Sequence, residues 1–578
     1  MPSYKTVFVS LPCALLLLAA ACGGAAPTAT PTRAPAPAPT AAPAPTPTPT
    51  QAPAGQPTPT VRAVVPTLAP TPTSPPRVVG SRGRIVYAKL NELGTNDPHA
   101  APSGGPDNVY QVAVFSGLLT INLDASRAPG LATAFEYSPD GTKLTLTIRK
   151  DATFHDGTPV TPADVKFSIE RLQSPYATRA PVYALLRDIT AVDLSGDKVT
   201  LTFKTPNPLF MQTQGSENIQ GISVVPKAAV ERLGNDGFNA KPIGAGAYKF
   251  ARRALNDYVE LEAHDAYYGP DKPHVKTIRM QIVPEDATRV AMLRTAEADI
   301  VEQIPPPVAK QIEKIAGLRA LRVPSGIEIT MFFHTLAPTI PGTDKPNPLR
   351  DARVRQGVFY AIDRQAIIDR ILEGEGVFMK GPWSEGATGS DVSIITPYQY
   401  NPDKARQLFK EANLPTDVEF PVIYYQASPA VPAVFTAVVD YLNKGGMKAK
   451  GQIVEVGTAL SMWRGRTAYA MTLIRSGVGG AGGDPALAMR VRILTDGQLS
   501  QYNDPTVDKL ITGGEPIFDQ QKRHEHFKQL WKYAHEQALF VPLYQDVGIH
   551  GLGKRVDWKF PPGNPSHLRR VTWREGSP

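Results

Sequence analysis

The feature that most limits what this chain can fold into is a proline-rich segment near its N-terminus. Between residues 27 and 76, 17 of 50 residues are proline, mostly alternating with Ala and Thr. Proline fixes φ, lacks a backbone N–H and favours an extended conformation at the preceding residue, so this segment cannot build a core. At ~3.1 Å per residue in a polyproline II conformation it could span on the order of 150 Å. We expect a tether, with recognition by a proline-binding domain as the alternative.

The residues before the tether predict a signal peptide over residues 1–21. A single cation, Lys5, precedes an apolar run of about 15 residues, which is shorter than the ~20 residues of a membrane-spanning helix. The run ends in Leu-Ala-Ala-Ala before Cys22, which resembles a bacterial lipobox except for Ala19, where Leu is usual. The resemblance implies cleavage before Cys22 and lipidation of its thiolate. The alternative is an ordinary signal peptide, and residues 22–81 then still contain the tether.

The rest of the chain has the composition of a globular protein with a balanced charge. Hydrophobic residues make up 42% of the sequence and charged residues 20%, which is enough to bury a core. Seven of the 61 Lys and Arg residues, and no acidic residue, lie in the first 91 residues, so the net charge of +8 belongs mostly to the N-terminal part. No basic nucleic-acid-binding surface is therefore expected. The two cysteines, Cys13 and Cys22, exclude a disulfide scaffold and a multi-cysteine metal site.

From residue 82 onward, hydrophobic periodicity predicts an α/β fold without a short repeat. Residues 131–150 are predicted to form a hairpin, because an apolar stretch is followed by Ser-Pro-Asp-Gly and then by residues that alternate between apolar and polar. Thr161, followed by a proline and by Asp164, predicts the start of a helix. A long helix over residues 519–536 is predicted to precede an apolar strand over 539–544.

Several segments, taken in order, resemble family 5 of the extracellular solute-binding proteins, which are the dipeptide-, oligopeptide- and nickel-type receptors of ABC importers. The resemblance is most specific over residues 131–172 and covers roughly residues 84–560. One local departure is Ala247, where the family usually has Pro. The other matching segments are Asn96 to His99, Lys241 to Tyr248, His264 to Gly269, Pro348 to Arg364, Tyr400 to Ala405 and Phe540 to Leu543.

The resemblance implies a two-lobed α/β clamp of the periplasmic-binding-protein type II, with an extra subdomain on the first lobe. Two strands that cross between the lobes, near Val323-Pro324-Ser325 and Phe540-Val541-Pro542, would then act as the hinge. The expected boundaries are residues 82–123, 226–322 and 541–578 for lobe I, 124–225 for the extra subdomain and 323–540 for lobe II.

The same resemblance directs attention to the glycine-rich residues 477–483 and to Asp484. In peptide-binding relatives an Asp of the corresponding loop pairs with the ammonium group of the peptide, which implies that role for Asp484. The alternative is that Asp484 caps the loop. The family commonly has Trp on the preceding strand, whereas this chain has Arg475, a cation that would favour a ligand with a carboxylate or phosphate. No Gly-Lys-Ser/Thr follows the glycines, so a phosphate-binding P-loop is not expected.

Five further residues are candidates for ligand contacts, and for each the alternative is a place in the core. Aromatic side chains combine a large apolar area with a polar edge, which suits the wall of a ligand cleft. Tyr87 and His99 lie near the end of the first strand, where α/β sheets present groups to ligands. The aromatic candidates from the second lobe are Trp383, Trp463 and Tyr469.

Other polar clusters are better explained by the fold. His155-Asp156-Gly157 suits a turn, and Arg353 with Asp351 suits an ion pair on a helix surface. His524 and His526 are two residues apart and do not share a helix face, whereas a zinc motif needs a spacing of four. We therefore expect no metal site and no cofactor.

The leading hypothesis is a lipid-anchored receptor, acting as a monomer outside the cytoplasm, that delivers a peptide or similar solute to the permease and ATPase subunits of an ABC importer. The second hypothesis keeps the clamp fold but assigns it a different ligand, which is an oligosaccharide, a nickel chelate or an opine-like anion. The presence of Arg475 is the reason for this hypothesis. The third is a secreted enzyme, but the folded part contains no Gly-x-Ser-x-Gly, no His-Glu-x-x-His and no cysteine nucleophile. We therefore expect a binding protein and no catalytic residues.

Overall fold

The structure is a computed structural model that describes residues 82–575, apart from 101–107, 125, 178–185, 187, 209, 214–220, 426–430, 467–468, 477–483, 498 and 561–566. The predicted signal peptide, Cys22 and the tether lie outside the described residues. Within the described part, no helix combines the length and the apolar character needed to cross a membrane.

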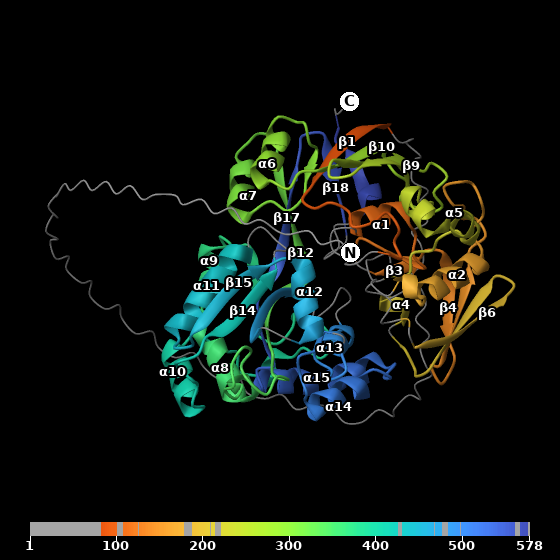
Figure 1. Ribbon diagram of the computed structural model, residues 1–578. Coiled ribbons are helices and arrows are strands. Elements are labelled where there is room, and N and C mark those ends of the chain that lie inside the picture. Colours follow the sequence, from red (N-terminus) through yellow and green to blue (C-terminus); the bar gives the residue numbers. More distant parts are fainter. Residues whose placement is uncertain are drawn as a thin grey trace, which may run out of the picture. The chain divides into compact units, whose positions relative to one another are not determined.

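The main element is an eleven-stranded mixed sheet in the order β15-β14-β16-β12-β17-β11-β1-β10-β9-β8, with β13 paired to β17 (Figure 1). Its strands are β1 (Arg82–Lys89), β8 (Tyr248–Ala254), β9 (Tyr258–Ala263), β10 (Val275–Ile282), β11 (Ile300–Val301), β12 (Arg319–Phe333), β13 (Gly376–Phe378), β14 (Phe420–Tyr425), β15 (Ala449–Val454), β16 (Met471–Ser476) and β17 (Phe540–Leu552).

The long antiparallel strands β12 and β17 carry the chain between the two halves of this sheet. Residues 319–324 of β12 pair with 547–552 of β17, and residues 328–332 pair with 540–545. The register shifts between Pro324 and Glu328, where the regular ladder is interrupted. We call residues 324–328 and 545–547 the hinge segment. The strand order and this register confirm the α/β fold predicted from the sequence.

The first half of the sheet carries buried apolar clusters on its two faces. One contains Ile85 and Tyr87 of β1, and the other contains Ala88 of the same strand, as the alternation of side chains along a strand requires. The elements around this half are α1 (Asn108–Val114), α5 (Lys227–Ala240), α6 (Asp286–Arg294), α7 (Pro306–Glu313), β18 (Val556–Trp558), η4 (Leu568–Arg570) and β19 (Val571–Trp573).

Residues 119–213 add a small four-stranded antiparallel sheet in the order β4-β5-β7-β6. The predicted hairpin is confirmed, because β4 and β5 pair across a turn at residues 138–141. The predicted helix start is also confirmed, because the N–H and hydroxyl of Thr161 donate to the carboxylate of Asp164 at 2.9 and 2.6 Å. The elements are β2 (Leu119–Ile121), β3 (Arg127–Pro129), β4 (Ala132–Tyr137), β5 (Lys143–Ile148), α2 (Pro162–Leu172), η1 (Pro175–Ala177), β6 (Ile189–Ser195), β7 (Lys198–Phe203) and α4 (Phe210–Thr213).

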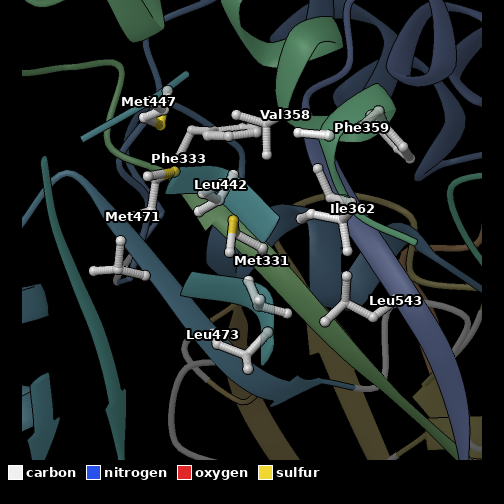
Figure 2. Packing of buried hydrophobic residues seen from close by; sticks show 14 of the residues in the cluster. Met331, Phe333, Val358, Phe359, Ile362, Leu442, Met447, Met471, Leu473 and Leu543 are labelled. Atoms are coloured by element: carbon white, nitrogen blue, oxygen red, sulfur yellow. The ribbon is translucent and has the colours of Figure 1, made fainter. Parts of the chain in front are cut away.

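The second half of the sheet is also packed on both faces. Met331, Phe333 and Leu473 belong to one cluster (Figure 2), and Phe332 and Ile474 belong to the other. Its helices are η2 (Pro348–Arg350), α8 (Ala352–Ala361), α9 (Arg364–Arg370), η3 (Val392–Ile394), α10 (Pro402–Glu411), α11 (Val431–Lys444), α12 (Val456–Gly465), α13 (Ala486–Arg492), α14 (Pro505–Gly514) and α15 (Gln520–Glu536).

The packing of β17 bears on the lobe boundaries predicted from the sequence. Val541, Leu543 and Tyr544 pack in the core of the second half, although the sequence-based boundary assigns residues 541–578 to lobe I. The boundaries remain a prediction, and these contacts favour a crossing point at the hinge segment.

Candidate functional site

Strand directions place the carboxyl ends of both halves of the sheet toward the hinge segment. In the first half, β10, β1 and β11 are parallel. Ile300 of β11 pairs with Leu552 of β17, and Val301, the last residue of β11, pairs with Gly551, which is nearer the hinge segment. In the second half, β14, β15 and β16 are parallel, and Ser476, which ends β16, pairs with Glu328. Ligands of open α/β sheets bind outside the carboxyl ends of the strands. The candidate site is therefore formed by these two edges at the hinge segment.

Arg475 lies at this edge of the second half. Its Nε and Nη2 atoms donate to Oδ2 of Asp546 at 3.1 and 2.8 Å, and the two side chains are 21% and 15% exposed. The ion pair joins the end of β16 to the hinge segment of β17. The guanidinium of Arg475 is therefore already paired with a carboxylate of the protein, and its role as a ligand contact remains a prediction.

Glu328 is a second charged group at the hinge segment, and it is fully buried. The hydroxyl of Ser384 donates to Oε1 of Glu328 at 2.9 Å. Burial of a carboxylate is costly unless hydrogen bonds or opposite charges offset the lost hydration. Glu328 was missed from the sequence because it follows Pro324-Ser325-Gly326, which suggests a turn and not the middle of a long strand.

Asp484 is held by a buried arginine of α15. Arg523 donates to its carboxylate from Nε at 2.6 Å and from Nη2 at 3.1 Å, and the backbone N–H of Ala486 donates to Oδ1 at 3.0 Å. The side chain of Asp484 is 10% exposed and that of Arg523 is 1% exposed. This geometry has the features of the capping alternative. The role of Asp484 as a ligand anchor remains a prediction.

Three aromatic candidates of the second half are buried in its core. Trp383 is fully buried and packs edge-on against Trp531 with ring centroids 5.0 Å apart. Tyr469 is also fully buried and stacks on His334 at 5.2 Å. Trp463 belongs to the same cluster as Trp383 and is 6% exposed. Their contacts are those of core residues, and their ligand roles remain predictions.

His99 belongs to a buried polar network of the first half. Nη1 of Arg171 lies 3.0 Å from Nδ1 of His99, and Nε2 of His99 lies 2.8 Å from the carbonyl O of Ser223. Burial lowers the pKa of His99 to about 4, and the nearby Arg171 acts in the same direction. His99 is therefore neutral near pH 7, and its contacts connect Arg171 and Ser223, which are distant from it in the sequence.

Tyr87 lies on β1 close to the carboxyl edge, fully buried and edge-on to Trp558 at 6.0 Å. The sequence-predicted residues therefore do not form one cluster. Arg475 and Tyr87 lie on strands that end at the candidate site, whereas the contacts of Asp484, His99 and the three aromatics are those of the protein interior. Sequence reasoning missed Lys89. The signal that could have revealed it is its position as a charged residue at the end of an apolar strand.

Within the described ranges, no group of three or more His, Cys, Asp or Glu side chains is arranged to hold a metal ion. His524 and His526 contact different parts of the chain. Nδ1 of His524 accepts from the N–H of Gly389 at 3.1 Å, and Nε2 of His526 lies 2.7 Å from the carbonyl O of Leu510.

Comparison with known proteins gives a consistent result. The sequence model described as "Bacterial extracellular solute-binding proteins, family 5 Middle" matches residues 127–491. The chain is 26% identical over 439 residues to the probable D,D-dipeptide-binding periplasmic protein DdpA of Escherichia coli K12, covering 74% of this chain and 80% of DdpA. It is 30% identical over 324 residues to the glutathione-binding protein GsiB of Pectobacterium atrosepticum, covering 55% and 59% of the two chains.

Among solved structures, the binding protein AgaA of A. tumefaciens R10 in complex with agropinic acid has the same fold. Its TM-score is 0.74 at 24% identity, and the match covers 85% of this chain and 99% of AgaA. The two-lobed clamp predicted from the sequence is thereby confirmed as the fold.

Proposed function

Because this chain belongs to family 5 of the bacterial extracellular solute-binding proteins, we propose that it captures a peptide or peptide-like solute and delivers it to the permease of an ABC importer. The observation that carries the proposal is the pairing of β12 with β17. These two strands join the halves of the sheet, and their register shifts where the carboxyl ends of both halves meet.

The mechanism follows from that connection. A hinge built from two strands allows the lobes to open and close around a ligand with small changes in backbone conformation. A ligand that contacts both lobes binds the closed form more tightly and shifts the population toward it. The permease then distinguishes the loaded receptor by its closed shape, and its ATPase subunits drive transport. No chemical change of the solute is part of this mechanism.

The names of the relatives support a peptide as the first choice of ligand. DdpA is described as a dipeptide-binding protein and GsiB as a glutathione-binding protein, and glutathione is itself a small peptide. An opine-like anion is the second candidate, because AgaA binds agropinic acid and because Arg475 provides a cation at the candidate site.

We further propose that the chain is a lipid-anchored monomer on the outer face of the cytoplasmic membrane. The Leu-Ala-Ala-Ala sequence before Cys22 and the proline-rich tether support this arrangement. Mass spectrometry of the protein from membranes is expected to show a lipidated N-terminal Cys22, and the Cys22→Ser variant is expected to lack the lipid. An unmodified Cys22 in the mature protein would disprove the anchor.

Calorimetric titration of the folded part with peptides of two to five residues tests the ligand class. We expect saturable binding of at least one peptide at millimolar concentration or below. Absence of binding by all of them would disprove the peptide version. Titration with an opine such as agropinic acid tests the second candidate, and absence of binding to both classes would count against the proposed function.

A further inference from the structure

Four polar side chains gather at the carboxyl edge of the first half of the sheet, next to the hinge segment. We call Tyr87, Lys89, Glu302 and His550 the edge cluster. Tyr87 and Lys89 are alternate residues of β1 and therefore project from the same face of the sheet. The N–H of Glu302 donates to the carbonyl O of Ala88 at 2.9 Å, which places Glu302 beside the end of β1. His550 is separated by one residue from Leu552, the β17 partner of Ile300.

A shared aromatic contact shows that Tyr87 and His550 lie on one face. Tyr87 and His550 both pack against Trp558, with ring centroids 6.0 and 5.5 Å apart. Trp558 is 2% exposed, and its Nε1 donates to the carbonyl O of His567 at 3.1 Å. The indole therefore forms a fixed apolar wall beside polar groups.

The edge cluster has more polar capacity than the described residues use. Lys89 is fully buried, and its Nζ donates to the carbonyl O of Asn91 at 2.8 Å. Nδ1 of His550 is buried without a hydrogen-bond partner among the described residues. The hydroxyl of Tyr87 lies beside the carboxylate of Glu302, and burial together with this carboxylate raises the pKa of Tyr87. Buried polar atoms are normally satisfied by protein, by water or by a ligand, so Nδ1 of His550 has room for one further hydrogen bond.

Opposite charges lie side by side in the cluster without pairing. Oε2 of Glu302 accepts from the N–H of Leu90 at 3.1 Å, and no ion pair joins Glu302 to Lys89 within the described part of the chain. An ammonium at the end of β1 and a carboxylate directly after β11, each with unused hydrogen-bonding positions, match a ligand that carries the reverse arrangement of charges.

Gly548 leaves room for such a ligand on β17. A Cβ atom at this position would first meet the carbonyl O of Val323 at 3.8 Å and then Nε2 of His550 at 3.9 Å, so no neighbour fills the space. Residues 548 and 550 are on the same side of β17, and the open space therefore adjoins the edge cluster.

We propose that the edge cluster binds the headgroup of a zwitterionic ligand that carries its ammonium and its carboxylate on one carbon atom. Nζ of Lys89 donates to the ligand carboxylate, and the carboxylate of Glu302, beside the hydroxyl of Tyr87, accepts from the ligand ammonium. This assignment rests on the proposed function and narrows its substrate class. An anion alone would be repelled by Glu302, and a cation alone by Lys89.

His550 contributes no charge to this arrangement near neutral pH. Burial lowers its pKa to about 4, although the nearby Glu302 acts in the opposite direction. The ring is therefore a neutral polar surface between Trp558 and the open space above Gly548.

Calorimetric titration with glutathione and with γ-L-glutamyl-L-alanine tests the assignment, because both carry the two charged groups on one carbon. N-acetylated forms of the two probes, and L-alanyl-L-alanine, lack this headgroup. We expect the wild type to bind the first set at least tenfold more tightly than the second. Lys89→Met and Glu302→Gln should each weaken binding of the first set by about tenfold or more, because each removes a charge-assisted hydrogen bond.

Two controls separate an effect on the site from an effect on folding. Lys450→Met removes an exposed lysine of β15 that pairs with Glu419, and it should leave binding unchanged. Gly548→Ala fits the open space, whereas Gly548→Leu fills it and should abolish binding of both γ-glutamyl probes. Thermal unfolding of each variant shows whether the fold is retained.

The outcomes distinguish this assignment from the proposed function. Binding of L-alanyl-L-alanine without binding of the γ-glutamyl probes would overturn the headgroup assignment and leave the proposed function intact. Equal binding of the free and acetylated probes, or an affinity that Gly548→Leu leaves unchanged, would overturn the assignment as well. Failure of every probe to bind would overturn it and would also count against the proposed function.

Discussion

The guanidinium of Arg171 joins side chains from four parts of the first half of the chain. It donates to both carboxylate oxygens of Asp97 at 3.0 and 2.5 Å and to Oδ1 of Asn235 at 2.9 Å. The hydroxyl of Tyr176 also donates to Asp97, at 2.9 Å. The side chains of Arg171 and Asp97 are 6% and 0% exposed, so each of the two buried charges is stabilised by the other.

Replacement of Arg171 by Met is expected to lower the free energy of unfolding by about 3–5 kcal/mol, because it leaves the carboxylate of Asp97 buried without its partner. Denaturant unfolding followed by circular dichroism measures the change. The matched control is Arg406→Met, which breaks an exposed pair with Asp403 and should cost less than about 1 kcal/mol. Equal effects of the two substitutions would contradict this view of the network.

Buried histidines make the stability of the fold depend on pH. Nε2 of His155 and Nδ1 of His264 both contact the carbonyl O of Gly246, at 3.1 and 3.2 Å. Burial lowers the pKa of His155 to about 3 and also lowers the pKa of His264. Both rings therefore gain a proton more readily in the unfolded chain than in the folded protein.

We expect the free energy of unfolding to fall as the pH is lowered below about 6.5, the unfolded pKa of histidine, and this loss to continue toward pH 3. His155 alone contributes about 1.4 kcal/mol per pH unit over this window. Denaturant titrations at several pH values measure the slope, and His155→Gln should reduce it. A slope that is the same in the variant would show that His155 does not contribute.

At the scale of elements, Asp484, which precedes α13, is joined to α15 by an ion pair with Arg523. Arg523 also donates to the carbonyl O atoms of Gly514 and Glu515 at 2.6 and 3.0 Å, so its guanidinium ties together α13, α14 and α15. Loss of Asp484 would leave a buried cation at this junction.

Asp484→Ala is therefore expected to lower the free energy of unfolding by about 3 kcal/mol without any ligand present. Thermal or denaturant unfolding of the ligand-free protein measures the effect. The result separates the two roles of Asp484, since an anchor used only for a ligand would leave the stability of the free protein unchanged.

Local elements were predictable from the sequence where the signal is local. The hairpin at residues 138–141 and the cap at Thr161 depend on neighbouring residues, and the structure confirms them. The continuous strand β12 was not predictable from the local pattern, because Pro324 and the two residues after it are typical of a turn, and only the family resemblance placed a crossing strand there. Its partner β17 lies more than 200 residues away, and only the pairing keeps this segment extended.

The candidate site was predictable only in part for the same reason. The sequence around Trp383 and Tyr469 does not distinguish an aromatic side chain that lines a ligand cleft from one that fills the hydrophobic core. The edge cluster draws on β1, on the residue after β11 and on β17, which are far apart in the sequence, so its residues become neighbours only through strand pairing.

At the scale of the whole molecule, contacts among the described residues join the region of the small sheet to the second lobe. The ring of Phe518, between α14 and α15, lies edge-on to Tyr137 of β4 with centroids 5.3 Å apart. Nη1 of Arg490 on α13 lies 3.5 Å from Asp188 and 3.6 Å from Glu515. Phe518 is 39% exposed, so this contact is at the surface.

Phe518→Ala is expected to weaken ligand affinity by roughly two- to tenfold. The reason is that an aromatic pair stabilises the lobe arrangement in which it forms by about 0.5–1.5 kcal/mol. Calorimetry with the peptide found by screening measures the affinity, and the melting temperature of the free protein should change little. Exposed Leu255, between β8 and β9, offers the control substitution Leu255→Ala. An unchanged affinity in Phe518→Ala would show that the contact does not assist closure.

The antiparallel course of β12 and β17 has a consequence for how this polypeptide can be divided. Pro324 pairs with Val547, so the chain leaves the first lobe and re-enters it on adjacent strands, about 5 Å apart. With the crossing point at the hinge segment, we predict that the second lobe is a continuous insertion and that a short β-turn linking residues 324 and 547 would bridge its deletion. The first lobe, in contrast, is assembled from segments on both sides of the insertion, and a single cut in the gene cannot isolate it.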